Sequence, residues 1–241
     1  MRQVPQYLII GNGRVARHFQ HYFSLLTISF SVWDRSQPIE KLHQLTEQAT
    51  HILILIKDHA IDAFCEMNLQ KTKAFCIHFS GSHISPHAYG VHPLMTFHDG
   101  MYALEDYFAI PFIVDHDAPE FNALFPNIPN KHIKLDKSDK SKYHALCVMS
   151  GNFSCILWQK LFSYFEEELN IPAQFAHPYL YQQTKNLLSN AKTALTGPLV
   201  RGDETTLKKN LAALENDPFQ EIYLSFVNCY KKIVEVQHEH T

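Results

Sequence analysis

The chain has 241 residues, of which 46% are hydrophobic and 19% charged, a balance typical of a folded globular protein rather than a disordered one. The formal net charge of −3 offers no basic surplus, so we expect no nucleic-acid partner. No apolar run approaches the ~20 residues that a membrane helix needs, and an apolar strand that begins at Tyr7 leaves no room for a cleavable leader. The five cysteines are odd in number and form no CxxC pair, which favours reduced thiols in a cytoplasmic protein without a membrane partner.

Short apolar runs alternate with helical patterns through the first half of the chain. The runs predict strands over residues 7–10, 28–33, 51–56, 74–79, 108–114 and 132–135. Residues 90–93 are expected to lead into a loop. Apolar spacing predicts helices over residues 14–26, 38–48 and 61–69. Strands that alternate with helices indicate right-handed βαβ units and a parallel sheet, so we predict an α/β fold with a Rossmann-type domain over residues 1–137.

The second half changes character at residue 138, beyond which no strand is evident. A long helical pattern covers residues 143–169, and His177-Pro178 opens a second helix with proline at its first position. The last helix is expected to begin at Asp217 as N-cap, with Gln220 at capping-box spacing. We therefore predict that residues 138–241 form an all-helical domain.

A glycine-rich turn lies between the first strand and the first helix. Its six residues, which match the pattern G-x-G-x-x-[GA], are Gly11, Asn12, Gly13, Arg14, Val15 and Ala16. The first glycine permits the tight turn, the second leaves room for a pyrophosphate, and the small alanine lets helix and strand pack closely. The helix N-terminus offers unpaired N–H groups to phosphates. This context predicts a dinucleotide-binding turn, against the alternative of a simple tight turn.

The end of the second strand carries two conflicting signals about the cofactor. Asp34 stands about 20 residues beyond the turn, where an acid favours NAD by bonding a ribose 2′-hydroxyl. Arg35 and Ser36 follow directly and suit the 2′-phosphate of NADP. We favour NADP, with NAD as the alternative, because Asp34 can instead bind another ribose hydroxyl or cap the turn. For Arg35 the alternative is a solvated loop residue that binds no phosphate.

Further stretches, together with the glycine turn, resemble an uncharacterised bacterial family that joins a Rossmann-like domain to a C-terminal helical domain of unknown function. These stretches follow one another in order along nearly the whole chain: His78-Phe79-Ser80-Gly81-Ser82, Val91-His92-Pro93-Leu94 with Phe97, Tyr143-His144-Ala145 with Gly151-Asn152, and Ala194-Leu195-Thr196-Gly197-Pro198 with Arg201-Gly202-Asp203. The two-domain plan is similar to that of ketopantoate reductases, 6-phosphogluconate dehydrogenases and pyrroline-carboxylate reductases.

The resemblance implies an NAD(P)-dependent oxidoreductase with a site between its domains and a homodimer formed through the helical half. A small polar or anionic substrate would meet the nicotinamide beyond Ile56, Lys57 and Asp58, at the end of the third strand. An alternative is a catalytically silent NADP-binding sensor or partner-binding protein.

Catalytic candidates come from the resemblance and from the histidines. In the similar enzymes a lysine one helical turn from an asparagine serves the reacting group; Asn152 fits the asparagine, but Val148 stands in the lysine position. His144 is a substitute for proton transfer, with a structural histidine as the alternative.

A second candidate pair is Ser80 and His92, which we expect to follow strand ends, where an open α/β sheet binds its ligand. The His-Pro turn is similar to that of prephenate dehydrogenases, although the spacing is shorter and Thr96-Phe97 replaces the usual glycine. The alternatives are a rigid turn residue for His92 and a strand-end turn for Ser80.

Two further expectations concern charge and metal. Thr196 and Arg201 are candidates for substrate binding, against the alternative of a helix connection in which Asp203 caps the helix over residues 204–214. Five of the sixteen histidines fall between His78 and His98, but they lack partners at metal-ligand spacing, so we predict no metal site.

Overall fold

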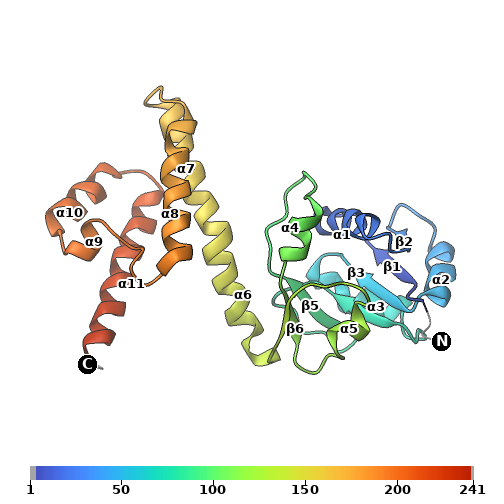
Figure 1. The fold of residues 1–241 in the computed structure, drawn as a ribbon. Helices are drawn as coiled ribbons and strands as arrows, with labels where there is room; N and C mark the ends of the chain where they lie inside the picture. Colours follow the sequence, from blue (N-terminus) through green and yellow to red (C-terminus); the bar gives the residue numbers. More distant parts are fainter. Residues whose placement is uncertain (1–3, 240–241) are drawn as a thin grey trace. The chain divides into compact units, whose positions relative to one another are not determined.

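The computed structural model describes residues 4–239, with side chains up to residue 236. Contacts divide the chain into two compact units, Met1–Leu157 and Trp158–Thr241. The first unit carries all the strands of the described residues, and the second consists of helices and their connections (Figure 1). The α/β fold with a helical C-terminal part is therefore confirmed. The division expected at residue 138 stays a prediction, and residues 138–157 group with the sheet.

Seven strands form one sheet in the first unit. They are β1 (Tyr7–Ile10), β2 (Phe30–Trp33), β3 (His51–Ile54), β4 (Phe75–His78), β5 (Tyr89–Pro93), β6 (Phe112–Asp115) and β7 (His132–Leu135). Their spatial order is β2-β1-β3-β4-β5-β6-β7. All neighbouring pairs are parallel except β5 and β6, which run antiparallel with Val91 opposite Val114. The sheet is thus mostly parallel, and its carboxyl edge collects the loops after β1 to β5.

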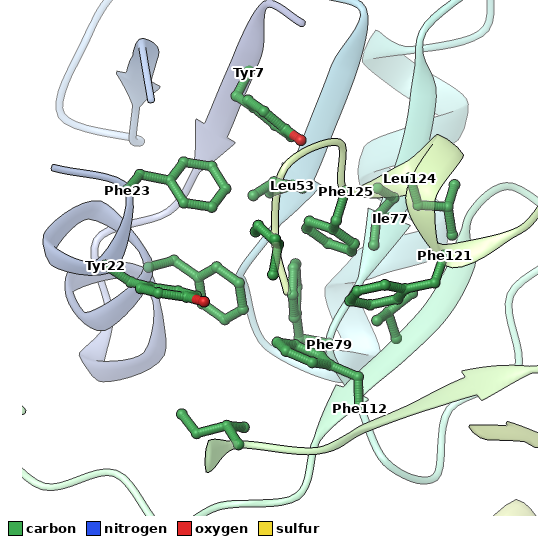
Figure 2. Packing of buried hydrophobic residues seen from close by; sticks show 14 of the residues in the cluster. Tyr7, Tyr22, Phe23, Leu53, Ile77, Phe79, Phe112, Phe121, Leu124 and Phe125 are labelled. Carbon is green, nitrogen blue, oxygen red and sulfur yellow. The ribbon is translucent and has the colours of Figure 1, made fainter. Parts of the chain in front are cut away.

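Helices cover both faces of this sheet because successive strand residues point to opposite sides. On β1, Tyr7 and Ile9 pack with α1 (Arg14–Leu25), α4 (Leu104–Ala109) and α5 (Phe121–Leu124). Figure 2 shows this first core, in which Tyr22 and Phe23 from α1 approach the strands. The alternate residues of β1 pack on the other side with α2 (Ile39–Gln48) and α3 (Ile61–Asn68). Burial on both faces explains why these strands read as continuous apolar runs.

Two strand predictions are corrected by the structure. Residues 89–93 form β5, so His92 lies inside a strand rather than after one, and residue 90 does not open a loop. The strand expected from residue 108 begins only at Phe112, because α4 continues to Ala109 and Pro111 follows it. A short strand with a histidine and a proline lacks the alternating pattern that identifies a strand in sequence.

The long helix predicted over residues 143–169 is longer and less regular than expected. It comprises α6 (Lys140–Val148), a π-helical segment, η3 (Met149–Phe153), and α7 (Ser154–Glu167). The Ser154 hydroxyl donates to the carbonyls of Ser150 and Gly151 at 2.6 and 2.8 Å and so bonds carbonyls in the wider turn. The π segment lies between His144 and Asn152, so the regular 100° spacing assumed for those two residues does not hold across it.

The second unit contains α8 (His177–Asn190), α9 (Pro198–Arg201), α10 (Glu204–Ala213) and α11 (Phe219–Glu239). Pro178 lies in the first turn of α8, as predicted. Asp203 caps α10 by accepting from the Thr206 N–H at 3.0 Å, also as predicted. The capping box at α11 is wrong, because the Gln220 side chain donates to the Leu211 carbonyl instead. None of the helices in residues 4–239 combines the length and the apolar character that a membrane crossing requires.

Candidate functional site

The glycine turn leads from β1 into α1 and leaves open space at the start of that helix. Gly11 has a φ of +114°, and a Cβ there would lie 2.3 Å from the Leu55 carbonyl oxygen. A Cβ at Gly13 would meet no heavy atom within 4 Å, so this glycine keeps an open space beside the start of α1. Ala16 is 1% exposed and belongs to the core under the helix. The first and third positions of the motif serve the fold, and Gly13 leaves room for a ligand at the helix N-terminus.

The arginines of α1 face a neighbouring loop. Arg14 Nε and Arg17 Nη2 lie 3.4 and 3.0 Å from Asp99 Oδ1, and these three side chains are about half exposed or more. Because the pairs are solvent-exposed, they contribute little to stability.

Asp34 organises the turn after β2. Its Oδ1 accepts from the Ser36 hydroxyl and the Ser36 N–H at 2.5 and 2.9 Å. These bonds from Ser36, together with one from Asn12, lower the pKa of Asp34. The carboxylate thus caps the turn, which is the alternative considered for it above, while Arg35 remains exposed. Asn12 links this turn to the glycine turn.

A hydrogen-bonded loop follows β4 at the carboxyl edge of the sheet. The Ser80 hydroxyl donates to Asp58 Oδ2 at 2.5 Å. Ser80 Oγ in turn accepts from the N–H groups of Ser82 and His83 at 3.3 and 3.0 Å. Ser80 is 8% exposed and has its hydrogen-bonding capacity filled. It therefore holds the loop to Asp58 and is not an activated nucleophile.

His92 on β5 and His144 on α6 converge on Gly81, and Tyr143 on α6 contacts His92. His92 Nδ1 lies 2.7 Å from the Tyr143 hydroxyl, and the His92 and His144 ring centroids are 5.7 Å apart. A Cβ on Gly81 would lie 3.1 Å from His92 Nε2 and 2.4 Å from His144 Cδ2. Only glycine leaves both rings in place, which gives a physical reason for the glycine in the His-Phe-Ser-Gly-Ser stretch.

The environment of this cluster favours neutral side chains. Burial lowers the pKa of His92 to about 4, with smaller contributions from His144 and Lys140 in the same direction. Burial also raises the pKa of Tyr143, and the neighbouring Cys147 adds to that effect. A neutral imidazole carries one N–H, and we expect the Tyr143 hydroxyl to donate to Nδ1. The hydrogen of His92 then lies on Nε2, next to Gly81.

His78, His83 and His87, which lie close to His92 in the sequence, have different surroundings. His78 is fully buried, its Nδ1 accepts from the Ser80 N–H at 3.3 Å, and its Nε2 has no partner. His83 and His87 lie 3.1 Å from acids of α3, Asp62 and Glu66 respectively. Across residues 4–236, no three histidine, cysteine or acidic side chains come together as a metal site would require.

The structure assigns no role to the other predicted residues. Asn152 is exposed in the π segment. Thr196 and Arg201 belong to the second unit and are exposed. Lys57 is exposed and Ile56 half-buried after β3. Sequence reasoning named His92 and His144 but not Tyr143, whose only signal was its place in the Tyr-His-Ala stretch, 51 residues from His92.

Residues 110–228 match the model of the family described as "Domain of unknown function (DUF2520)". The match covers the end of the sheet and most of the helical part, so the family resemblance expected from the sequence is confirmed. No curated protein matches the chain.

Solved structures resemble the whole chain, and three of them serve as examples. The first is a protein from Bacteroides fragilis, provisionally named an NADP oxidoreductase. It has 21% identity and a TM-score of 0.74, with 95% of this chain and 98% of that chain covered. Protein TM1727 from Thermotoga maritima has 20% identity and a TM-score of 0.68, with 96% and 99% covered. The pyrroline carboxylate reductase of Plasmodium falciparum, solved with NADP bound, has 12% identity and a TM-score of 0.54, with 94% and 96% covered. At these identities the likeness establishes the fold.

Proposed function

We propose that this protein, which carries a DUF2520 domain over residues 110–228, is an NADP(H)-dependent oxidoreductase acting on a small polar or anionic substrate. The observation that carries the proposal is the open space over Gly13 at the start of α1, next to a strained Gly11 that no other residue would replace without cost. The structures with the same fold include one solved with NADP bound, which supports the cofactor class.

The chain's residues fit a dinucleotide. The N–H groups at the start of α1 would hold the diphosphate, with Arg14 beside them. When bound, the nicotinamide supplies or accepts the hydride. Ile56, Lys57 and Asp58 would border that end of the cofactor, because they follow β3 at the carboxyl edge of the sheet.

The turn after β2 supports NADP over NAD. Asp34 already accepts two hydrogen bonds from Ser36 and one from Asn12, so its carboxylate is committed to the turn. Arg35 is exposed and has the planar fork that suits a phosphate. We therefore propose that Arg35 binds the 2′-phosphate, and that Ser36 contributes when its hydroxyl turns from Asp34 to the phosphate.

His92 is our principal catalytic candidate. Its Nε2–H would donate to the oxygen or nitrogen of a substrate double bond and polarise it, and Tyr143 would hold the ring in the right tautomer. His144 would border the same space, and Ser80 would position the loop through Asp58. Asn152, Thr196 and Arg201 remain predicted contributors to substrate binding.

Calorimetry with purified protein tests the cofactor. We expect NADPH to bind, and Arg35→Ala to weaken NADPH by tenfold or more while changing NADH little, because a charge-assisted phosphate contact is lost. Arg17→Ala is the matched control, because Arg17 lies on α1 and its side chain pairs with Asp99. Equal losses for both cofactors would remove the 2′-phosphate role, and no binding of either would remove the proposal.

A screen of ketoacids, imines and hydroxyacids with NADPH or NADP⁺ tests the reaction. Turnover should fall ~100-fold in His92→Gln, because a positioned proton donor contributes about that much. His43→Gln, on the outer surface of α2, is the control.

The second candidate function is a catalytically silent NADP sensor, favoured by Val148 where similar enzymes carry a lysine. Tight NADPH binding without turnover of any compound in the screen would support it. In that case His92→Gln would leave NADPH affinity unchanged.

We further propose a homodimer formed through the helical part, in the cytoplasm. Large apolar side chains of the second unit are exposed, among them Tyr181, Leu188 and Phe226 at 66%, 83% and 52%. Such a surface is typical of an association site. The five cysteines are free thiols, as expected in a reducing compartment. Analytical ultracentrifugation should give about twice the monomer mass of 27.9 kDa, and a monomer at all concentrations would contradict the dimer.

A further inference from the structure

A buried ion pair lies beside the candidate site, between β6 and the first residue of α6. Lys140 Nζ lies 2.6 Å from Asp115 Oδ1, and the two side chains are only 5% and 2% exposed. The second carboxylate oxygen, Oδ2, accepts from the Gly90 N–H at 2.9 Å. Both oxygens of the Asp115 carboxylate therefore bind groups in the interior of the protein. Charged side chains are almost never buried to this extent unless they are paired, and removing one partner of such a pair leaves the other charge without compensation.

Gly90 on β5 is shaped around this pair. A Cβ at Gly90 would lie 2.4 Å from Lys140 Nζ and 2.7 Å from both Asp115 oxygens. No side chain fits there without displacing the ammonium or the carboxylate. Gly90 is also only two residues before His92, so the same strand carries the seat of the ion pair and the candidate catalytic histidine.

Lys140 begins the helix that carries the partners of His92. Tyr143 and His144 follow it by three and four residues, which places all three on one side of α6. Tyr143 reaches His92 Nδ1, and His144 reaches Gly81. No side chain caps the start of α6. The ion pair between Lys140 and Asp115 therefore holds the first turn of α6 against β6.

We propose that Lys140 and Asp115 are positioning residues, which fix the first turn of α6 against β5 and β6 so that Tyr143 holds His92 in one orientation. The inference rests on the proposed function, since it concerns the same His92. It assigns a role to two residues that make no contact with a substrate or cofactor and that the sequence did not single out.

The charge of Lys140 acts in the same sense as its position. Lys140 and His144 from α6 lower the pKa of His92, while Asp58 from η1 (Asp58–Ala60) raises it, and burial is the largest cause. Tyr143, the remaining titratable group in contact, stays protonated. Lys140 therefore helps to keep the imidazole neutral, with its hydrogen available on Nε2.

Nitrogen-15 NMR of histidine-labelled protein tests the proposal without any turnover. In the wild type we expect His92 in the single tautomer with hydrogen on Nε2, and no titration between pH 5 and 8. In Lys140→Met the Nδ1 shift should move towards that of Tyr143→Phe, and the midpoint of His92 should rise by on the order of one pH unit. In the double variant Lys140→Met/Tyr143→Phe, the tautomer should change no more than in Tyr143→Phe alone.

Two further variants keep the test decisive. Lys134→Met is the control, because Lys134 pairs with Glu120 at the surface of β7 and should leave His92 unchanged. If Lys140→Met does not fold, Asp115→Asn/Lys140→Met replaces it, since the asparagine oxygen still accepts from Gly90 and no charge is left unpaired. Wild-type shifts and titration of His92 in either folded variant overturn the proposal.

The readout also separates this inference from the proposed function. NADPH affinity, measured on the same samples, should change less than twofold in Lys140→Met, because β3, β4 and β5 lie between β6, which carries Asp115, and β1, which leads to Gly13. If the wild type binds no NADPH, the proposed function is wrong. The NMR result on His92 still decides the role of Lys140 in that case.

Discussion

The two units of the chain differ in how far they bury their apolar side chains. In the sheet unit, Ile9 and Ile10 on β1 are fully buried, one on each face. In the helical unit, Phe175 and Leu188 are 68% and 83% exposed. A sheet covered by helices on both faces completes its own core, whereas helices with apolar stripes on their outer faces need another surface. The sheet unit thus encloses its apolar side chains, whereas the helical unit leaves several of its large ones at the surface.

The largest expected effect separates the two units directly. Phe23→Ala in the first core should lower the free energy of unfolding of the sheet unit by about 3–5 kcal/mol, because it opens a cavity at a fully buried site. Phe226→Ser in the second unit should change it by less than ~0.5 kcal/mol, and should weaken association instead.

The two tryptophans make this measurable, since Trp33 lies in the sheet unit and Trp158 in the helical unit. Urea unfolding followed by the fluorescence of Trp33 in a Trp158→Phe background reports the sheet unit alone. A loss as large for Phe226→Ser as for Phe23→Ala would contradict the independence of the two units.

The next effect is a loss of stability in acid that belongs to the sheet unit. Burial lowers the pKa of His78 to about 3, while the unfolded chain protonates near 6.5. Between these values the unfolded state binds the extra proton, so the stabilisation is present above pH 6.5 and is lost as the pH falls towards 3. By pH 4 the loss from His78 is ~3 kcal/mol.

Replacement of this histidine provides the check. His78→Asn keeps an acceptor for the Ser80 N–H but cannot titrate, so its unfolding free energy should vary less between pH 7 and 4 than that of the wild type. His59→Asn, at an exposed position, should retain the wild-type dependence. Identical pH profiles for His78→Asn and the wild type would exclude His78 as the cause.

The glycine turn gives a sharper comparison within the sheet unit. Gly11→Ala should cost ~2–3 kcal/mol of stability, because φ is +114° and the new Cβ meets the Leu55 carbonyl. Gly13→Ala should leave stability within ~0.5 kcal/mol and should weaken NADPH at least tenfold, since its Cβ enters only the open space. Urea unfolding and calorimetry on both variants check this. Weakened binding in Gly11→Ala alone would reverse the roles assigned to the two glycines.

The smallest effect concerns local structure in the helical unit. Asp203→Ala should cost about 1 kcal/mol, because Asp203 accepts from the N–H and hydroxyl of Thr206 at the start of α10. Thermal unfolding followed through Trp158 measures it, with Glu215→Ala beyond the end of α10 as the control. No difference between these variants would show that the cap is replaced by water.

Most of the predicted strands are confirmed, the buried β1 as well as the largely exposed β7. Tyr7 to Ile10 are apolar in succession, and a local pattern of this kind needs no knowledge of the rest of the chain. The strand at Tyr89 to Pro93 was missed because its character depends on pairing with β4 and β6. Its glycine is explained by Lys140, which lies 50 residues further along.

The candidate site divides in the same way. His92, His144 and Ser80 were recognisable as chemically capable residues in distinctive stretches. Their roles were not, because the Ser80 hydroxyl is already filled by Asp58 and two backbone groups, and His92 is oriented by Tyr143. Hydrogen-bond saturation is a property of neighbours in space, which spacing along the chain does not encode.

The amino-acid order alone therefore determined the sheet class, the phosphate-type turn and the helical second half, since each depends on periodicity or on the backbone freedom of one glycine. The tertiary structure decided which histidine is held and by which neighbours, and the burial that comes with it lowers the pKa of that histidine. Those properties arise from burial and from contacts such as Asp115 with Lys140, where residues far apart in sequence share one dry space in which charge is costly.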